Sequence, residues 1–301
     1  PYVAKDLFAT RGILTTAASD VLAEYIPPYN ATVIEDLVDA PMLGKANMDE
    51  YAMGTTGEYS AFGPTKNPYD LARVSGGSSS GSAASVASGQ TPWSLGTDTG
   101  GSIRLPAGFT HTVGFKPTYG TYSRYGAIAM ASSLDTVGTF TRTVEDAAYL
   151  LEHLAHRDPL DTTSRETVNQ QGLTERVRRA DIRGMKFGVP REFMELEGMQ
   201  PAVKEAFMHA IEKITAAGGE IVEISLPHAE YAINAYYILA PSEVSSNMAR
   251  YDGLQFGSRA LGNSIDEVMM NARAKFGAEV QRRILIGTYT LSGEFDESLY
   301  H

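Results

Sequence analysis

The feature that most constrains the fold is an alternation of strand and helix patterns in the second half of the chain. Residues 184–190 form a short apolar run that ends in a proline, which is typical of a strand. Residues 201–216 carry apolar side chains at helical spacing, with a proline in the first turn and a glycine just after the end. Residues 219–227 again alternate like a strand. This order predicts an α/β fold with a mixed, largely buried central sheet flanked by helices.

The first half contains compatible signals and no boundary between domains. The opening residues read as a strand already under way, and Thr143 with Asp146 resembles a capping box at the start of a helix. We find no internal repeat and no convincing linker, although the polar segment 155–182 is expected to be exposed. We therefore predict one domain over residues 1–301. Because both ends are abrupt, we expect that the natural chain continues beyond them.

Composition excludes several classes of function. The formal net charge of −11 argues against nucleic-acid binding by this chain itself, although a basic partner is not excluded. No apolar run approaches the roughly 20 residues that span a bilayer, so we expect no membrane segment. With no cysteine, thiolate metal sites and cysteine nucleophiles are impossible. Covalent chemistry must use a hydroxyl, an amine or a carboxylate, and nothing indicates a metal site.

Residues 75–108 are the unusual part of the sequence. They contain eight glycines and nine serines, yet Val86, Trp93, Leu95 and Ile103 interrupt them, so they do not resemble a flexible linker. Two glycine-rich turns that each end in serine suit acyl transfer, in which one hydroxyl attacks and nearby N–H groups bind the oxyanion.

The second of these turns, "TDTGGS" at 97–102, provides the candidate nucleophile. Ser102 would attack, and the amides of Thr99, Gly100 and Gly101 would form the oxyanion hole. A phosphate-binding loop is a competing interpretation, but neither turn fits the spacing of a P-loop or a dinucleotide fingerprint. A loop of small residues used only for tight packing is the other alternative.

The sequence alone does not identify the base that would activate this serine. The six histidines show no motif spacing, so a Ser-His-Asp arrangement has no support, although it stays possible. A buried neutral lysine can serve instead, and Lys5 in the apolar opening segment is a candidate.

Several motifs follow one another in a characteristic order, among them "VAKDLFATRGILTTAAS", "GGSSSGSAASVASG", "LGTDTGGSIRLPAG" and "GFKPTYGTYSRYGAIAMASSLDTVG". In this order they resemble the amidase signature family over nearly the whole chain. The segments "SEVSSNMARYDGLQFG" and "EVQRRILIGTYTLS" are more similar to the branch that supplies the A subunits of the glutamyl-tRNA(Gln)/aspartyl-tRNA(Asn) amidotransferases than to other amidases.

The resemblance implies a catalytic triad. Its base lysine falls on Lys5, its bridging serine on Ser78 and its nucleophile on Ser102. In this family the bridging serine follows a cis peptide bond and relays the proton from the nucleophile to the neutral lysine. The resemblance also places Tyr236 and Arg283 around a glutamine substrate, with the arginine suited to the α-carboxylate.

The remaining expectations concern the pocket and the partners. Met53 and Gly54 are expected to line the pocket, and core packing is the alternative for both. The resemblance implies a glutamine amidohydrolase subunit of a heterotrimeric, tRNA-dependent amidotransferase, which releases ammonia for the amidation of misacylated Glu-tRNA(Gln) or Asp-tRNA(Asn). The tRNA would be bound by a partner, and ATP and Mg²⁺ are expected only at a partner subunit.

Two other functions stay open at this point. They are a stand-alone amidase on another small carboxamide and an inactive, truncated scaffold subunit. By resemblance, N-terminal helices and a C-terminal segment of the family domain are missing here. The location is expected to be cytoplasmic, with an organelle possible.

Overall fold

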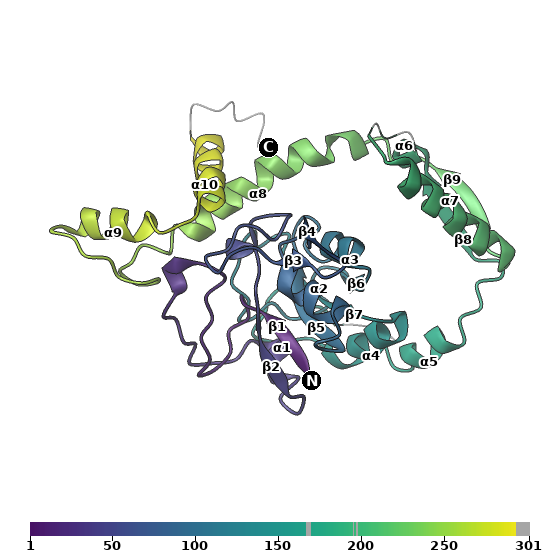
Figure 1. Ribbon diagram of the computed structural model, residues 1–301, viewed down its shortest axis with the longest axis horizontal. Coiled ribbons are helices and arrows are strands. Elements are labelled where there is room, and N and C mark those ends of the chain that lie inside the picture. The colour runs from purple at the N-terminus through teal and green to yellow at the C-terminus, as the bar shows by residue number, and fades with distance from the viewer. Residues whose placement is uncertain (167–169, 195, 197, 293–301) are drawn as a thin grey trace. The chain divides into compact units, whose positions relative to one another are not determined.

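The computed structural model describes residues 1–166, 170–194, 196 and 198–292 (Figure 1). The chain divides into two compact units, of which the larger contains residues 1–177 together with those from 238 onward. The smaller unit is formed by residues 178–237. The single domain expected over the chain stays a prediction.

A five-stranded sheet forms the centre of the larger unit. Its order is β2-β1-β5-β7-β6, so that the N-terminal strand lies between two strands that follow much later. β1 (Tyr2–Lys5) pairs in parallel with β2 (Met42–Ala46) and with β5 (Trp93–Asp98). β7 (Thr136–Thr141) is antiparallel to both β5 and the edge strand β6 (Val113–Phe115). Because β1 and β5 are parallel, their carboxyl ends meet at one edge of the sheet.

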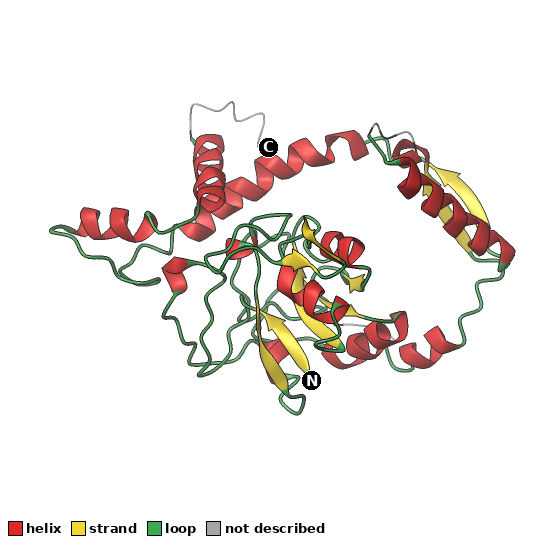
Figure 2. Cartoon of the chain, viewed as in Figure 1, coloured by secondary structure: helices red, strands yellow, loops and turns green. Residues whose placement is uncertain are grey.

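Helices α2, α3 and α4 pack on this sheet (Figure 2). α2 (Ser80–Ala87) contacts four of the five strands, and α3 (Arg104–Thr110) packs against α2 and β6. α4 (Val144–Leu154) packs on β7, and the predicted capping box is confirmed at its start. The Thr143 hydroxyl accepts the backbone N–H of Asp146 at 3.1 Å. The predicted mixed α/β architecture, with a buried sheet flanked by helices, is confirmed.

Other elements lie wholly or, for α5 (Leu173–Arg178), almost wholly in the larger unit. They are the 3-10 helices Asp20–Leu22 and Glu50–Ala52, α1 (Thr32–Glu35), β3 (Lys66–Asn67), β4 (Asp70–Val74), α5 (Leu173–Arg178), α9 (Ile265–Arg273) and α10 (Ala278–Leu291). Helix α8 (Ala232–Met248) begins in the smaller unit and continues into the larger one.

The smaller unit confirms the alternation seen in the sequence. β8 (Lys186–Pro190) and β9 (Glu220–Ile224) are parallel, and α7 (Pro201–Ala216) connects them. The unit also contains α6 (Arg191–Met194) and a 3-10 helix at Ala229–Tyr231. A parallel pair needs such a crossover helix, which explains why the strand and helix patterns alternate here.

Candidate active site

Lys5 lies at the carboxyl end of β1 and is completely buried. Its Nζ donates to Ser78 Oγ at 2.7 Å and to Thr97 Oγ1 at 2.9 Å. Burial lowers the pKa of Lys5 from 10.5 to about 7, although the negative charges of nearby aspartates oppose this shift. A large fraction of Lys5 is therefore neutral near pH 7 and can accept a proton.

Ser78 follows the glycine turn between β4 and α2. The peptide bond between Gly77 and Ser78 is cis, as the resemblance implied. The backbone N–H of Asp49 donates to the Ser78 carbonyl at 3.0 Å. A Cβ atom on Gly77 would collide with the Asp49 carboxylate, so this close approach requires glycine. The first glycine turn is thus held against the segment that contains Asp49.

The second turn is organised by Asp98, the last residue of β5. Its carboxylate accepts the backbone N–H groups of Gly101 at 2.9 Å and Ile103 at 3.1 Å. It also accepts two hydrogen bonds from the Arg104 guanidinium, at 2.9 and 3.0 Å. These bonds and the positive charge of Arg104 hold the pKa of Asp98 below its usual value, although burial alone would raise it. Asp98 therefore stays ionised and fixes the shape of the turn that carries Ser102.

The two turns are joined through their backbones. The N–H of Ser79 donates to the carbonyl of Ser102 at 3.3 Å, and the Ser79 hydroxyl donates to the carbonyl of Thr97 at 3.0 Å. Ser102 itself is only 8% exposed. Among the residues that the structure describes, no side chain forms a hydrogen bond with its hydroxyl. Lys5, Ser78 and Ser102 thus lie on adjoining segments at one edge of the sheet.

The three amides expected in the oxyanion hole differ in their hydrogen bonds. The N–H of Gly101 already donates to Asp98 at 2.9 Å. The N–H groups of Thr99 and Gly100 have no acceptor within the described part of the chain. The Thr99 hydroxyl donates to Asp135 at 2.6 Å, which anchors the turn. Thr99 and Gly100 are therefore the amides available in this geometry, and an oxyanion role for Gly101 stays a prediction.

Met53 and Gly54 lie beside the first glycine turn. Met53 is fully buried, and a Cβ atom on Gly54 would meet Asp49 Oδ2 at 2.6 Å. The Asp49 carboxylate in turn accepts the N–H groups of Gly57 at 3.1 Å and Tyr59 at 2.9 Å. Asp49 therefore connects Gly54 to the loop of Ser78, and the role of Met53 and Gly54 as pocket residues stays a prediction.

Arg283 belongs to the same electrostatic neighbourhood. It lies on α10, is only 6% exposed, and its Nε donates to Glu279 Oε1 at 2.8 Å. Burial raises the pKa of Asp49, and the charges of Lys5 and Arg283 partly offset this rise. Tyr236 lies in the smaller unit, where its ring packs edge-on against Tyr237. The assignment of both residues to a substrate stays a prediction.

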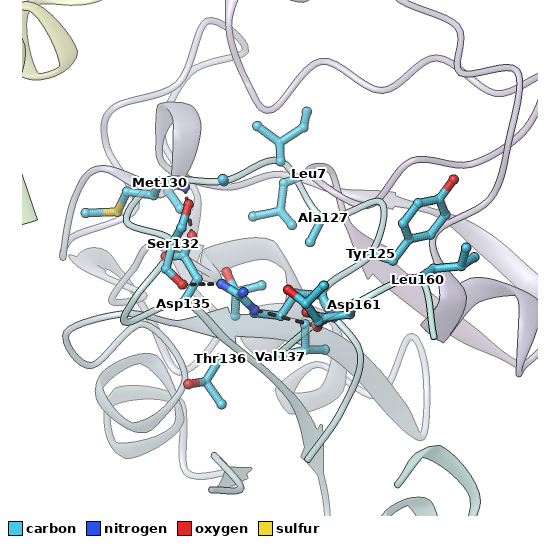
Figure 3. Close-up of a pocket in the computed structure, with 16 residues that line it drawn as sticks. Leu7, Tyr125, Ala127, Met130, Ser132, Asp135, Thr136, Val137, Leu160 and Asp161 are labelled. Atoms are coloured by element: carbon cyan, nitrogen blue, oxygen red, sulfur yellow. Dashed lines mark hydrogen bonds and ion pairs between the residues drawn. The ribbon is translucent and has the colours of Figure 1, made fainter. Parts of the chain in front are cut away.

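A cavity of about 220 Å³ adjoins the candidate site through Thr97 (Figure 3). Figure 3 shows Ser132, Asp135 and Asp161 among its polar walls, with Leu7 and Val137 among its apolar ones. Because Thr97 accepts a hydrogen bond from Lys5, this cavity reaches the immediate neighbours of the candidate base.

Sequence reasoning missed three residues of this site. They are Thr97, which accepts from Lys5, Asp98, which organises the serine turn, and Asp49, which connects the glycine turns to the pocket segment. Asp98 had a usable signal, because an aspartate at the start of a turn commonly accepts backbone N–H groups a few residues later in the chain. Asp49 and Thr97 had none, because their partners are far away in the sequence.

The histidine alternative has no geometric support in the described residues. His153 contacts the carbonyl of Tyr149, and His156 contacts Asp36 at 2.8 Å. No described histidine forms a hydrogen bond with Ser102. Within the part of the chain that the structure describes, no helix is long and apolar enough to cross a membrane.

Comparison with known proteins places these features in a wider context. The family model described as Amidase matches residues 1–301. The A subunit of the glutamyl-tRNA(Gln) amidotransferase from Moorella thermoacetica is 50% identical over 303 residues, which cover 100% of this chain and 62% of that protein. The corresponding protein from Nitrobacter winogradskyi is 51% identical over 310 residues, with the same coverage of both chains. The chain therefore spans about three fifths of the length of the curated relatives it matches.

Solved structures of amidases also match this chain over nearly its whole length. A crystal structure of the A subunit of glutamyl-tRNA(Gln) amidotransferase from Thermotoga maritima matches with a TM-score of 0.79 and 42% identity, covering 98% of this chain and 60% of that one. The native peptide amidase from Stenotrophomonas maltophilia matches with a TM-score of 0.83 and 28% identity, covering 100% of this chain and 63% of that one.

Proposed function

The chain belongs to the amidase family, and from this premise we propose that it is the glutamine-hydrolysing subunit of a tRNA-dependent amidotransferase. The observation that carries the proposal is the buried contact between Lys5 and Ser78 at 2.7 Å, beside the turn of Ser102. A buried lysine with a pKa of about 7 is the base that a serine nucleophile without histidine requires.

The proposed reaction begins with attack by Ser102 Oγ on the side-chain amide carbon of glutamine. The Ser102 proton passes to Ser78 Oγ, while the Ser78 proton passes to neutral Lys5 Nζ. Backbone N–H groups of Thr99 and Gly100 stabilise the oxyanion. When the tetrahedral intermediate collapses, the same relay returns a proton to the nitrogen, so that ammonia leaves and a γ-glutamyl ester stays on Ser102.

The second half of the reaction uses the same groups in the opposite direction. Water gives up a proton through Ser78 to Lys5 and attacks the ester carbonyl, and the proton returns to Ser102 as glutamate leaves. Arg283 would bind the α-carboxylate of glutamine, because a guanidinium can hold a carboxylate with two parallel hydrogen bonds. Met53 and Gly54 would line the pocket, and the substrate contact that the resemblance implies for Tyr236 stays a prediction.

The ammonia would serve a partner subunit. We propose that the partners bind misacylated Glu-tRNA(Gln) or Asp-tRNA(Asn), together with ATP and Mg²⁺, and carry out the amidation. The net charge of −11 supports this division of labour, because an acidic chain is poorly suited to hold tRNA itself. A cytoplasmic location is part of the same proposal.

A stand-alone amidase on another small carboxamide is the second candidate. The similarity to the peptide amidase from Stenotrophomonas maltophilia, with a TM-score of 0.83, favours it. Both candidates use the same acyl-transfer chemistry, so they differ in substrate and in dependence on partners.

The test is acyl transfer from glutamine to hydroxylamine. We expect the chain to form γ-glutamyl hydroxamate, and Ser102→Ala to abolish it, while Ser88→Ala at the exposed end of α2 leaves it unchanged. A panel of carboxamides with and without partner subunits separates the two candidates. A folded chain that forms no acyl-enzyme with any amide, even with partners, would support the inactive scaffold instead.

A further inference from the structure

Helix α10 begins without a capping side chain of its own. Its N-cap residue is Gly277, which has an extended backbone conformation and no side chain to accept the first N–H groups of the helix. Such helix starts leave unpaired donors and a partial positive charge. A negatively charged partner from elsewhere in the chain would therefore stabilise this end of α10.

Glu50 provides that partner across 227 positions of sequence. Its Oε2 accepts the N–H of Gly277 at 2.8 Å, and its Oε1 accepts the hydroxyl of Ser19 at 2.5 Å. The Glu50 side chain is buried, with only 6% of the residue exposed. A Cβ atom on Gly277 would collide with Glu50 Oε2, so glycine is required for the contact. The buried Glu50 carboxylate therefore binds Ser19 with one oxygen and Gly277 with the other.

The same helix carries Arg283 on its buried face. The buried residues of α10 follow helical spacing and form one stripe, which consists of Val280, Arg283, Gly287 and Thr290. Val280 packs in the main hydrophobic core, and at Gly287 the helix lies directly against the backbone of α8. Arg283 lies six residues after Gly277, or about 9 Å along the helix axis. The helix start, together with these two packing contacts, therefore fixes the position of Arg283.

The first turn of α10 also holds Arg283 directly. Glu279 lies in this turn and accepts the Arg283 Nε at 2.8 Å. If the first turn of α10 frays, Glu279 loses its fixed position, and its hydrogen bond to the Arg283 guanidinium is weakened. Glu50 thus acts on Arg283 through Gly277 and the first helical turn.

Glu50 is also connected to the loop of the candidate relay serine. It directly follows Asp49, whose N–H donates to the carbonyl of Ser78 at 3.0 Å. Two adjacent acidic residues therefore hold two different parts of the site, the loop of Ser78 and the helix of Arg283.

We propose that Glu50 is a positioning residue that caps α10 from a distance and holds Arg283 in register with the serine loop for substrates that carry a carboxylate. The proposal rests on the proposed function, since it assigns the α-carboxylate of the substrate to Arg283. Glu50 touches no reacting atom in this scheme, and it sets the affinity for amino-acid amides over amides without a carboxylate.

The test compares two substrates and three variants of the chain, assayed with partner subunits where these are needed. Glutamine carries the α-carboxylate, and butyramide has the same side-chain amide but neither the α-carboxylate nor the α-amino group. We expect Glu50→Ala to raise the KM for glutamine about tenfold, the effect of losing one hydrogen bond to a charged group, with the KM for butyramide changed less than about twofold. Glu50→Gln, which can still accept the Gly277 N–H, should restore most of the glutamine KM. Ser19→Ala removes the contact of the other oxygen, together with the hydrogen bond that Ser19 Oγ accepts from the N–H of Val21, but leaves the contact to Gly277 in place, so it serves as the matched control.

Hydrogen exchange of the first turn of α10 provides a readout that is independent of catalysis. We expect faster exchange at residues 278–281 in Glu50→Ala and near wild-type exchange in Glu50→Gln. Equal KM changes for both substrates, or unchanged exchange in Glu50→Ala, would overturn the proposal. A wild-type enzyme that turns over butyramide but not glutamine would refute the proposed function instead, while the exchange data would still decide whether Glu50 holds α10.

Discussion

Replacing Lys5 with methionine should abolish catalysis and, at the same time, stabilise the protein most strongly at low pH. Methionine has a similar length, and it carries no charge that needs to be buried. The wild-type protein places Lys5 in a fully buried position, where its pKa falls from 10.5 to about 7 because of desolvation. The charged form of Lys5 is therefore less stable in the folded protein than in the unfolded chain.

The sign of the pH dependence follows from proton binding. Between pH 7 and pH 10.5 the unfolded chain binds more protons at this lysine than the folded protein does, so wild-type stability rises with pH. Below pH 7 both states are protonated and the full penalty of about 5 kcal/mol applies. At pH 9 the penalty falls to about 2 kcal/mol. The methionine variant lacks this contribution, so its stability relative to wild type should fall by roughly 3 kcal/mol between pH 6 and pH 9.

Urea unfolding of both proteins at pH 6, 7, 8 and 9 measures this difference. The variant also loses the hydrogen bonds to Ser78 and Thr97, a loss of about 1–3 kcal/mol that is the same at every pH. Only the pH-dependent part of the difference is therefore diagnostic. In the wild type, kcat/KM should rise with pH and level off above about 7, as neutral Lys5 becomes dominant. A stability difference that does not vary with pH would refute the reasoning, and so would a rate profile without an inflection near pH 7.

Three other predictions follow from particular contacts. Ser102→Ala and Ser78→Ala should each lower the rate of hydroxamate formation at least about a thousandfold. Circular dichroism should show that both variants are folded. If either variant keeps more than a tenth of the wild-type rate, the proton relay is contradicted. Gly138→Ala should destabilise the protein by about 1–3 kcal/mol in urea unfolding, because its Cβ would collide with a backbone oxygen of β6. Partial burial lowers the pKa of His156, the hydrogen bond to Asp36 raises it, and the net result is a rise. Asp36→Asn should therefore lower the pKa of His156 in an NMR titration. The ion pair stabilises the wild type at acidic pH, and this stabilisation is lost as the pH rises through the His156 pKa, so the variant should be less stable than the wild type only at acidic pH. An unchanged His156 titration would contradict the ion pair.

Local patterns in the sequence predicted the local structure well. The helix expected at 201–216 is found with these bounds, and the Thr143 cap has the expected hydrogen bond. These features depend on residues a few positions apart, so a short window contains the whole signal. The order of the sheet could not be obtained in this way, because β1 pairs with β5 across about ninety residues and no local pattern encodes that pairing.

The same difference between local and distant contacts applies to the candidate site. Motif resemblance selected Lys5 and Ser78, and the structure brings their side chains into contact. Asp49 and Glu50 were not singled out as individual residues, because a carboxylate in a sequence does not indicate which distant N–H it will accept. Glu50 and Gly277 are a clear case, since neither residue has a local reason for its identity.

The place of β1 in the middle of the sheet has a consequence for handling the protein. Lys5 becomes buried, and so loses its ordinary basicity, only when β1 lies between β2 and β5. In an unfolded or partly folded chain, Lys5 is a solvated cation and Ser102 an unreactive alcohol. Under the proposed mechanism, labelling of Ser102 by a hydroxyl-directed electrophile therefore counts molecules with a completed sheet, and it would serve as an active-site titration of the folded fraction.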